Sequence, residues 1–151
     1  MHSHDTERLA ELIATKHELL VQMRDLGRLQ SDFIEAADFT QLLKVLAAKQ
    51  RVLSAIQSTE RELTPFRTQD PAARSWSSPQ ERQRCAGLAA RCDAIFHEIV
   101  EQERLSEARL ETQRNEASQR LHGAHSASQA RGAYVSQSQS GRSMLDISSG
   151  K

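Results

Sequence analysis

Apolar residues recur along the first part of the chain with the spacing of a helix that packs against other helices. From Leu9 to Phe33, leucine and methionine return at intervals of three, four or seven residues. Such a heptad pattern is typical of helices in coiled coils and bundles. Asp5 or Thr6 can cap the start of this stretch, so we expect a first helix over residues 5–35.

A second apolar stripe follows after a short corner. The heptad spacing resumes at Leu42, and Asp38 is a candidate N-cap in front of it. Pro65 disfavours a helical conformation in the residue before it, which predicts a second helix over residues 38–65. One continuous helix over residues 5–64 is an alternative, because no glycine or proline enforces the corner. A hairpin is favoured, because each half has its own stripe and needs a partner to bury it.

The clearest helix start in the sequence follows a polar connector over residues 68–78. Ser78 is a good N-cap, Pro79 suits the first helical position, and Glu81 can complete a capping box. The stripe that begins there is dense at first and becomes sparse towards its end. We expect a third helix over residues 79–121.

The amino-acid composition of the chain changes after the predicted third helix. Half of residues 122–151 are Ser, Gln or Gly. This composition cannot bury enough apolar surface to offset the entropy lost on ordering, so we expect a tail that is disordered in isolation. The predicted fold is all-α: an antiparallel helical hairpin plus a long third helix in a coiled-coil-like three-helix bundle over residues 1–121, followed by this C-terminal tail.

Composition and charge limit the classes of function that the chain can have. Aromatic residues make up 4% of the chain, which suits a thin core along helices better than a deep globular one. Twenty basic residues balance 20 acidic ones, with the signs interspersed, so we expect no nucleic-acid binding. No run of apolar residues is long enough to span a membrane, and the start lacks the features of a secretory signal. These observations predict a cytoplasmic protein.

The sequence contains no arrangement that indicates catalysis. It has no phosphate-binding glycine loop, no zinc-ligand spacing and no combination of acid, base and nucleophile. Cys85 and Cys92 lie seven residues apart on one helix face, too far to bond each other, and are expected to be reduced and half-buried. We therefore expect a protein that is not an enzyme and has no cofactor, no metal site and no catalytic residue.

Four residues within the pattern have two interpretations each. Gly27 marks either a close approach of another helix or a bend. Lys16 and Lys49 occupy seam positions, where their methylenes pack while the ammonium groups reach water, or where they pair with an acid. For the lysines the first interpretation is favoured. Trp76 is expected to cover the end of the bundle rather than to serve as an exposed anchor for a partner.

Two short apolar islands stand out in the tail. One contains Tyr134, and the other contains Met144, Leu145 and Ile147. Neither contributes to a bundle. One explanation is that these apolar residues arose by neutral sequence drift in a tail that has no function. The functional explanation is that they are recognition segments that fold on a partner.

The hairpin resembles that of the FlgN-type flagellar export chaperones, small cytoplasmic helical proteins that hold hook–filament junction subunits before type III export. The similarity rests on an Asp-centred corner followed by a Leu/Lys/Gln heptad run from Asp38 to Ile56, within residues 9–67, and on the Leu-Asp-Ile end of the tail. The Thr-Pro-Phe-Arg ending after Leu63 and the Trp76 connector depart from the pattern of the family.

The resemblance implies an export chaperone that binds junction subunits through its C-terminal helix and tail, with the export gate as a further candidate partner. The residues expected to bind the partner are Leu105, Leu110, Leu121, Tyr134, Met144, Leu145 and Ile147. The alternative is a structural or scaffolding coiled coil that self-associates through the same seams. A monomer or weak dimer is expected for the chaperone, and a stable oligomer for the scaffold.

Overall fold

The computed structural model describes residues 3–148, with side chains described for residues 5–137. Every regular element in this part of the chain is a helix, which confirms the all-α prediction and the hairpin with a long third helix. The elements in order are α1 (Ser3–Glu35), α2 (Phe39–Arg67), the 3-10 turn η1 (Pro71–Ala73) and α3 (Pro79–Ser148). The chain divides into two compact units, Met1–Ala108 and Arg109–Lys151.

The corner between α1 and α2 bends as the hairpin prediction requires, and it does so without glycine. Ala37 adopts a left-handed backbone conformation with φ of 54°. The Ala37 N–H donates to the Ile34 carbonyl at 3.0 Å, and the Asp38 N–H donates to the Phe33 carbonyl at 2.9 Å. These two bonds form a Schellman motif, which satisfies carbonyls at the end of α1. Asp38 then caps α2, because its carboxylate accepts from the Gln41 N–H at 3.2 Å.

The end of α2 lies two residues beyond the predicted one. Pro65 sits inside the last turn, and the helix continues to Arg67. Proline lacks an N–H and crowds the preceding turn, but one turn before the end of a helix only a single backbone bond is lost. The hydroxyl of Thr68, the C-cap residue, donates to the Pro65 carbonyl at 3.0 Å and closes this end.

The start of α3 confirms the predicted cap. The Ser78 hydroxyl oxygen accepts from the Glu81 N–H at 3.1 Å, and Pro79 is the first helical residue. Hydrogen bonds also hold the connector to the hairpin. The Thr6 hydroxyl of α1 donates to the Ser75 carbonyl at 2.8 Å. The connector is therefore tied to the first turns of α1.

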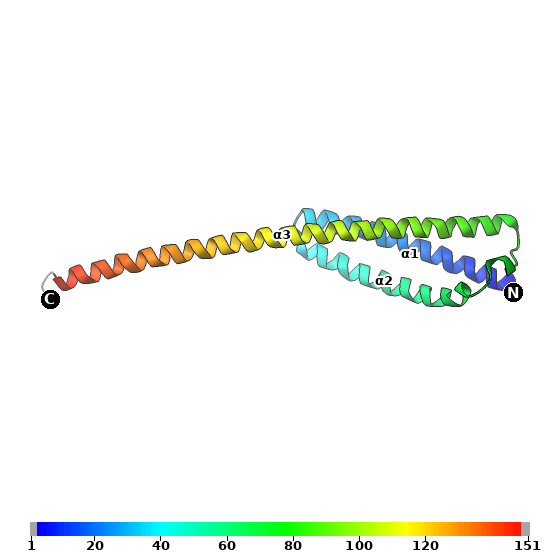
Figure 1. The fold of residues 1–151 in the computed structure, drawn as a ribbon, viewed down its shortest axis with the longest axis horizontal. Helices are drawn as coiled ribbons and strands as arrows, with labels where there is room; N and C mark the ends of the chain where they lie inside the picture. The colour runs from blue at the N-terminus through cyan, green and yellow to red at the C-terminus, as the bar shows by residue number, and fades with distance from the viewer. Residues whose placement is uncertain (1–2, 149–151) are drawn as a thin grey trace. The chain divides into compact units, whose positions relative to one another are not determined.

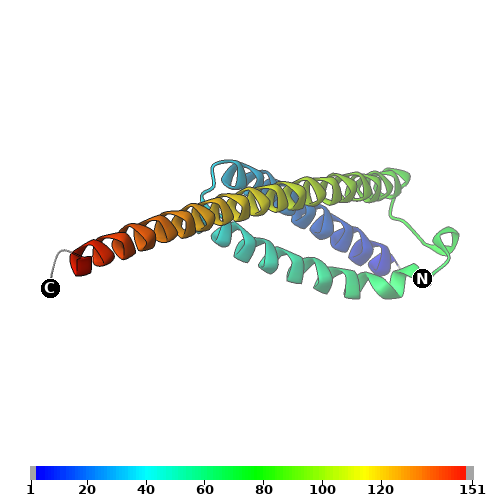
Figure 2. The same ribbon diagram turned by 60° about the vertical axis from the view of Figure 1, so that its left-hand side comes forward.

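Within the first unit, α1 and α2 are antiparallel, and the first part of α3 lies beside them (Figures 1 and 2). A guanidinium nitrogen of Arg8 in α1 donates to Glu62 near the end of α2 at 2.8 Å. Arg24 of α1 pairs with Glu98 of α3 at 3.4 Å. Both pairs are exposed enough to contribute only about 0–1 kcal/mol each, so they orient the helices rather than stabilise the bundle.

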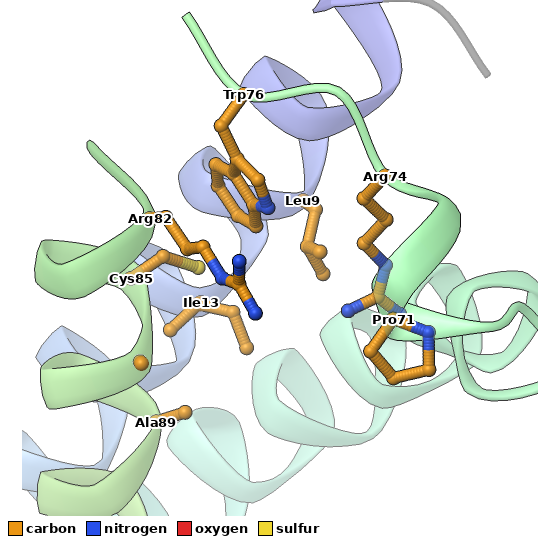
Figure 3. A pocket seen from close by; sticks show the side chains of 9 residues that line it. Leu9, Ile13, Pro71, Arg74, Trp76, Arg82, Cys85 and Ala89 are labelled. Atoms are coloured by element: carbon orange, nitrogen blue, oxygen red, sulfur yellow. The ribbon is translucent and has the colours of Figure 1, made fainter. Parts of the chain in front are cut away.

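The first of two hydrophobic clusters lies at the end of the bundle where α1 begins. Leu9, Leu12, Leu63 and Cys85 are buried there. The half-buried Trp76 packs against this cluster, as Figure 3 shows from close by. The expectation that Trp76 covers the bundle end is thus confirmed.

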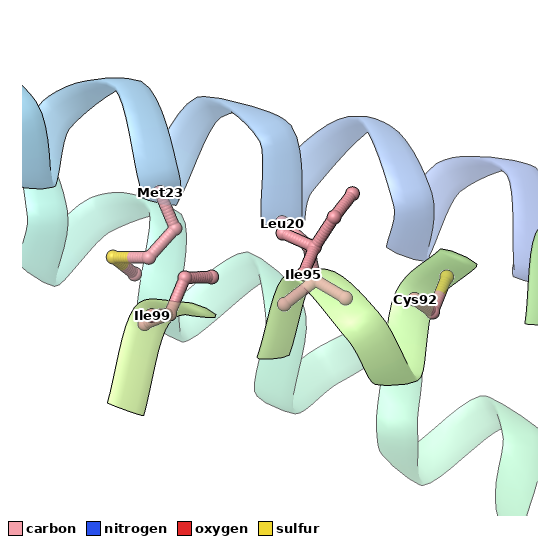
Figure 4. Packing of buried hydrophobic residues seen from close by; sticks show 5 residues of the cluster. All are labelled: Leu20, Met23, Cys92, Ile95 and Ile99. Atoms are coloured by element: carbon pink, nitrogen blue, oxygen red, sulfur yellow. The ribbon is translucent and has the colours of Figure 1, made fainter. Parts of the chain in front are cut away.

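The second cluster lies in the middle of the bundle. Leu20 and Met23 of α1 pack against Cys92, Ile95 and Ile99 of α3 (Figure 4). Burial of a large apolar side chain contributes about 1.5–3 kcal/mol, several times more than an exposed ion pair. Apolar packing therefore holds the first unit together. Both cysteines are free thiols, as expected, but they are buried in the clusters rather than half-buried.

The backbone of α3 remains helical beyond Leu121, where we expected the helix to end. Residues 122–148 include glycines but no proline, and local sequence therefore does not force a stop. Most described side chains from Arg109 onwards are exposed. The described side chains of this stretch form no buried core, in keeping with the composition that led us to expect a tail that is disordered in isolation.

Candidate functional site

The residues predicted to bind a partner are exposed where their side chains are described. Leu105 is 55% exposed, Leu121 73% and Tyr134 74%, whereas Leu110 is half-buried. The side chains of Met144, Leu145 and Ile147 lie outside the described residues. Exposed apolar side chains of this size on a helix are candidates for contact with another protein.

The predicted residues of the second unit do not form one continuous stripe. Successive residues of an α-helix are rotated by about 100°, so Leu110 and Leu121 share a face. By the same geometry, Tyr134 lies about 140° away from Leu121. One partner helix could contact the two leucines together but not the tyrosine as well.

A better-defined surface lies in the first unit, where α2 and α3 form the walls of an apolar groove and α1 forms its floor. The groove has a volume of about 460 Å³. Most of its lining is apolar: Leu20, Met23, Leu46, Leu53, Ile56, Phe96 and Ile99. Leu46, Leu53 and Phe96 are 40%, 39% and 54% exposed, which makes the walls accessible. The groove was not predicted from the sequence.

One polar residue ties the three helices together in this groove. Lys49 of α2 forms an ion pair with Glu103 of α3, and its ammonium also donates to the side-chain oxygen of Gln30 in α1. The Lys49 side chain is only 11% exposed, and burial lowers the pKa of its ammonium. Lys49 therefore pairs with an acid, the interpretation that the sequence disfavoured. Lys16 pairs similarly with Glu60 at 2.8 Å.

The size of the groove suits a short helix. Its α2 wall extends from Leu46 to Ile56, which corresponds to about 15 Å along a helix, or about three turns. Helices that dock in grooves use anchors at positions i, i+3 or i+4, and i+7. A three-turn segment with such an apolar stripe matches the length of this wall.

The two rims of the groove differ in charge. Residues three or four apart are neighbours on a helix surface, so Asp93, Val100 and Glu107 border the α3 wall. The α2 wall is bordered in the same way by Gln50 and Gln57. All five are exposed. The α3 rim therefore presents carboxylates, whereas the α2 rim in this stretch is uncharged.

The apolar residues that line the groove are visible in the sequence, but the sequence does not show that they remain exposed. Leu46 and Leu53 of α2 lie in the heptad seam itself, and Leu43 of α2 with Phe96 and Val100 of α3 widens the apolar stripes beyond it. Wide stripes are also found in closed bundles. Only the separation of α2 from α3 decides that these side chains line an open groove.

Other classes of site are not evident in the described part of the chain. Its helices include none that is long and apolar enough to cross a membrane. Among the same residues, no group of three or more His, Cys, Asp or Glu side chains is placed to hold a metal ion. The apolar groove is thus the candidate site with the most defined geometry. No protein-family profile matches the chain, and neither a curated protein nor a solved structure shows significant similarity to it.

Proposed function

We propose that this protein is a binding protein for an amphipathic helix of a client protein, not an enzyme. The observation that carries the proposal is the open groove between α2 and α3, with Leu46 and Leu53 on one wall and Phe96 on the other. A helix laid in this groove would add a fourth helix to a three-helix arrangement. Its apolar face would be buried against the side chains that are now exposed.

The charge of the rim indicates the chemistry of the client helix. Asp93 and Glu107 lie along the α3 rim, and the α2 rim opposite is neutral. A client helix with basic residues along one flank would place them beside these carboxylates. Charge of this kind steers association and orients the helix more than it adds affinity.

The biological form of this function that we propose is that of a type III export chaperone for hook–filament junction subunits. It follows from the resemblance of the Asp38–Ile56 run to the FlgN-type family. A chaperone of this kind shields an amphipathic terminal segment that would otherwise self-assemble. In this form the exposed Leu105, Leu121 and Tyr134 are proposed as further client contacts, separate from the groove.

Co-expression with candidate junction subunits, followed by measurement of the mass and dissociation constant of the complex, tests this proposal. The key variant is Leu53→Glu, which places a charge in the apolar wall. We expect it to weaken client binding by at least about tenfold, because burial of a carboxylate without a partner is costly. The matched control is Leu29→Glu, a leucine of α1 with 46% exposure that does not line the groove.

Truncation separates the groove from the C-terminal segment. A chain ending at residue 121 keeps the whole groove and removes Tyr134, Met144, Leu145 and Ile147. Loss of binding on truncation would assign the client contact to the tail. Equal loss in Leu53→Glu and Leu29→Glu, or full binding by Leu53→Glu, would contradict the role of the groove.

Self-association is the second candidate function, and the exposed Leu121 and Val135 of α3 favour it. A helix with such side chains gains stability when a second helix covers them. A scaffold would form a stable dimer or larger oligomer at micromolar concentration. A monomer in solution at this concentration favours the chaperone instead.

A further inference from the structure

A second pocket, distinct from the groove, lies at the other end of the first unit, beside Trp76. It has a volume of about 280 Å³. Its inner part is apolar, with Leu9 and Ile13 from α1 and Ala86 and Ala89 from α3. Cys85 completes this part, and because burial raises the pKa of its thiol, it lines the pocket as a neutral group.

Two arginines stand at the mouth of this pocket. Arg74 comes from the connector and Arg82 from the first turns of α3, and their guanidinium groups point towards each other across the opening (Figure 3). Within the described residues, neither forms an ion pair with a carboxylate. Two like charges that face each other over an apolar surface repel each other. An anion placed between them would be attracted to both guanidinium groups and would offset this repulsion.

Arg74 is held in place while part of its hydrogen-bonding capacity is unused. One of its terminal nitrogens donates to the Phe66 carbonyl at 2.7 Å. Its Nε is buried and has no hydrogen-bond partner among the described residues. Arg82 is exposed and free to adjust to a ligand. Two guanidinium groups can hold one carboxylate by several charge-assisted hydrogen bonds.

The same arginines also border an outer hollow of about 590 Å³. Trp76 and Ala86 are shared by both spaces, and the outer one is lined in addition by the polar Ser77, Ser78 and Gln83. The arginines therefore stand at the boundary between an apolar inner pocket and a polar outer space. A ligand that fits must have an apolar body, a negative charge next to it, and a polar continuation.

We propose that this pocket binds the C-terminal residue of a peptide, with an apolar last side chain in the inner pocket and its carboxylate between Arg74 and Arg82. The peptide backbone then leaves through the polar hollow beside Ser77 and Gln83. Trp76 forms one wall and excludes water from the carboxylate. The inference is independent of the groove, since the two sites have no lining residue in common.

The fluorescence of Trp76 provides a direct test, because it is the single tryptophan of the chain. The probe is acetyl-Gly-Gly-Leu with a free carboxylate, titrated into the full-length protein. We expect a saturable change in Trp76 emission, and binding weaker by at least about tenfold when the same peptide has an amidated C-terminus. Equal binding of the amide would overturn the proposal.

Two substitutions locate the site. Arg82→Gln should weaken binding of the free-carboxylate peptide by at least about tenfold, because one of the two charged partners is lost. The control, Arg84→Gln, removes an exposed arginine of the same helix turn that already pairs with Glu81 at 3.1 Å, and should leave binding unchanged. Ala89→Leu should fill the inner pocket and abolish binding while thermal melting stays close to that of the wild type. Unchanged binding in Arg82→Gln or in Ala89→Leu would overturn the assignment.

Small anions distinguish a peptide terminus from other sources of negative charge. Isocaproate has the apolar body and the carboxylate but lacks the peptide backbone, and inorganic phosphate has the charge alone. We expect isocaproate to bind more weakly than the peptide, and phosphate to compete only weakly. Isocaproate binding as tightly as the peptide would exclude a role for the outer hollow. Phosphate competing as well as the peptide would exclude a role for the apolar pocket.

Discussion

The side chain of Gln102 in α3 lies directly over Gly27 in α1. A β-carbon at Gly27 would overlap the side-chain oxygen of Gln102. The Gln102 amide nitrogen also donates to the Arg24 carbonyl at 3.2 Å, so this side chain links α3 to the backbone of α1. Of the two interpretations of Gly27 from the sequence, the structure shows a close contact at this position, made by a side chain of α3 and not by its backbone.

Alanine at Gly27 is expected to have little net effect on stability. Alanine gains about 1 kcal/mol of helix propensity over glycine, but the shift of Gln102 loses a hydrogen bond of about 0.5–1.5 kcal/mol. Gly87 is the matched control, because a β-carbon there meets nothing within 4 Å. Gly87→Ala should stabilise the protein by about 0.5–1 kcal/mol in urea unfolding. Equal stabilisation by both substitutions would show that Gln102 does not constrain Gly27.

A glycine at position 37 is expected to stabilise the hairpin. Ala37 has a φ of 54°, in the left-handed region that costs a residue with a β-carbon about 1–2 kcal/mol. Ala37→Gly removes this strain but increases the entropy of the unfolded chain, so we expect a net gain of about 0.5–1 kcal/mol. Thermal or urea unfolding measures it. Ala36→Gly, next to it and without a positive φ, should not be stabilising.

The buried ammonium of Lys49 should make the free energy of unfolding vary with pH in the alkaline range. Burial lowers the pKa of Lys49 in the folded protein, so the folded state loses this proton before the unfolded state does. Between the two pKa values the unfolded state binds more protons, and stability therefore rises with pH through that window. The difference in unfolding free energy between the wild type and Lys49→Met, followed from neutral pH to the ordinary lysine pKa, isolates this contribution.

Replacement of Lys49 alone also leaves Gln30 without its donor. Gln30 is only 3% exposed, and a buried acceptor without a partner costs about 1–3 kcal/mol. We expect Lys49→Met to be destabilising near neutral pH, and the double variant Lys49→Met with Gln30→Leu to recover most of that loss. Additive losses in the double variant would argue against the coupling.

Glu60 should contribute stability that is lost in acid. Burial alone would raise the pKa of this carboxyl group, but hydrogen bonds from Lys16 and Arg67 outweigh it and the pKa lies below its ordinary value. The contribution is complete above the pKa of the unfolded state and disappears as pH falls through the lower pKa of the folded state. Glu60→Gln should therefore destabilise the protein by about 1 kcal/mol at neutral pH, and by much less in strong acid. A pH series of urea unfolding curves for both proteins measures this.

The segment from Arg109 to Lys151 is expected to be largely unstructured as an isolated peptide. Most of its described side chains are exposed, and isolated helices without a packed face are marginal in water. Far-ultraviolet circular dichroism of this peptide should show low helicity, whereas residues 1–108 alone should be strongly helical and melt cooperatively. High helicity of the peptide at micromolar concentration, with a dependence on concentration, would instead indicate self-association.

The sequence alone predicted the features that depend on local interactions. The caps at Asp38 and Ser78 were predictable, because an N-cap needs only its own side chain and the next turn of the helix. The apolar stripes of α1 and α2 were also predictable, because they follow from the spacing of residues along a single helix. The corner at Ala37 was only one of two alternatives, because it lacks the glycine that usually marks it.

The tertiary structure alone decided which side chains of distant helices meet. Lys49 finds Gln30 and Glu103 on two other helices, and Arg74 faces Arg82 over an apolar pocket. Heptad spacing states which face of a helix is buried, but not how far apart two helices lie or which side chains remain uncovered. The helical fold of this protein thus follows from periodicity along the chain. The groove and the arginine pocket follow from the spacing between helices, which depends on the packing of all three.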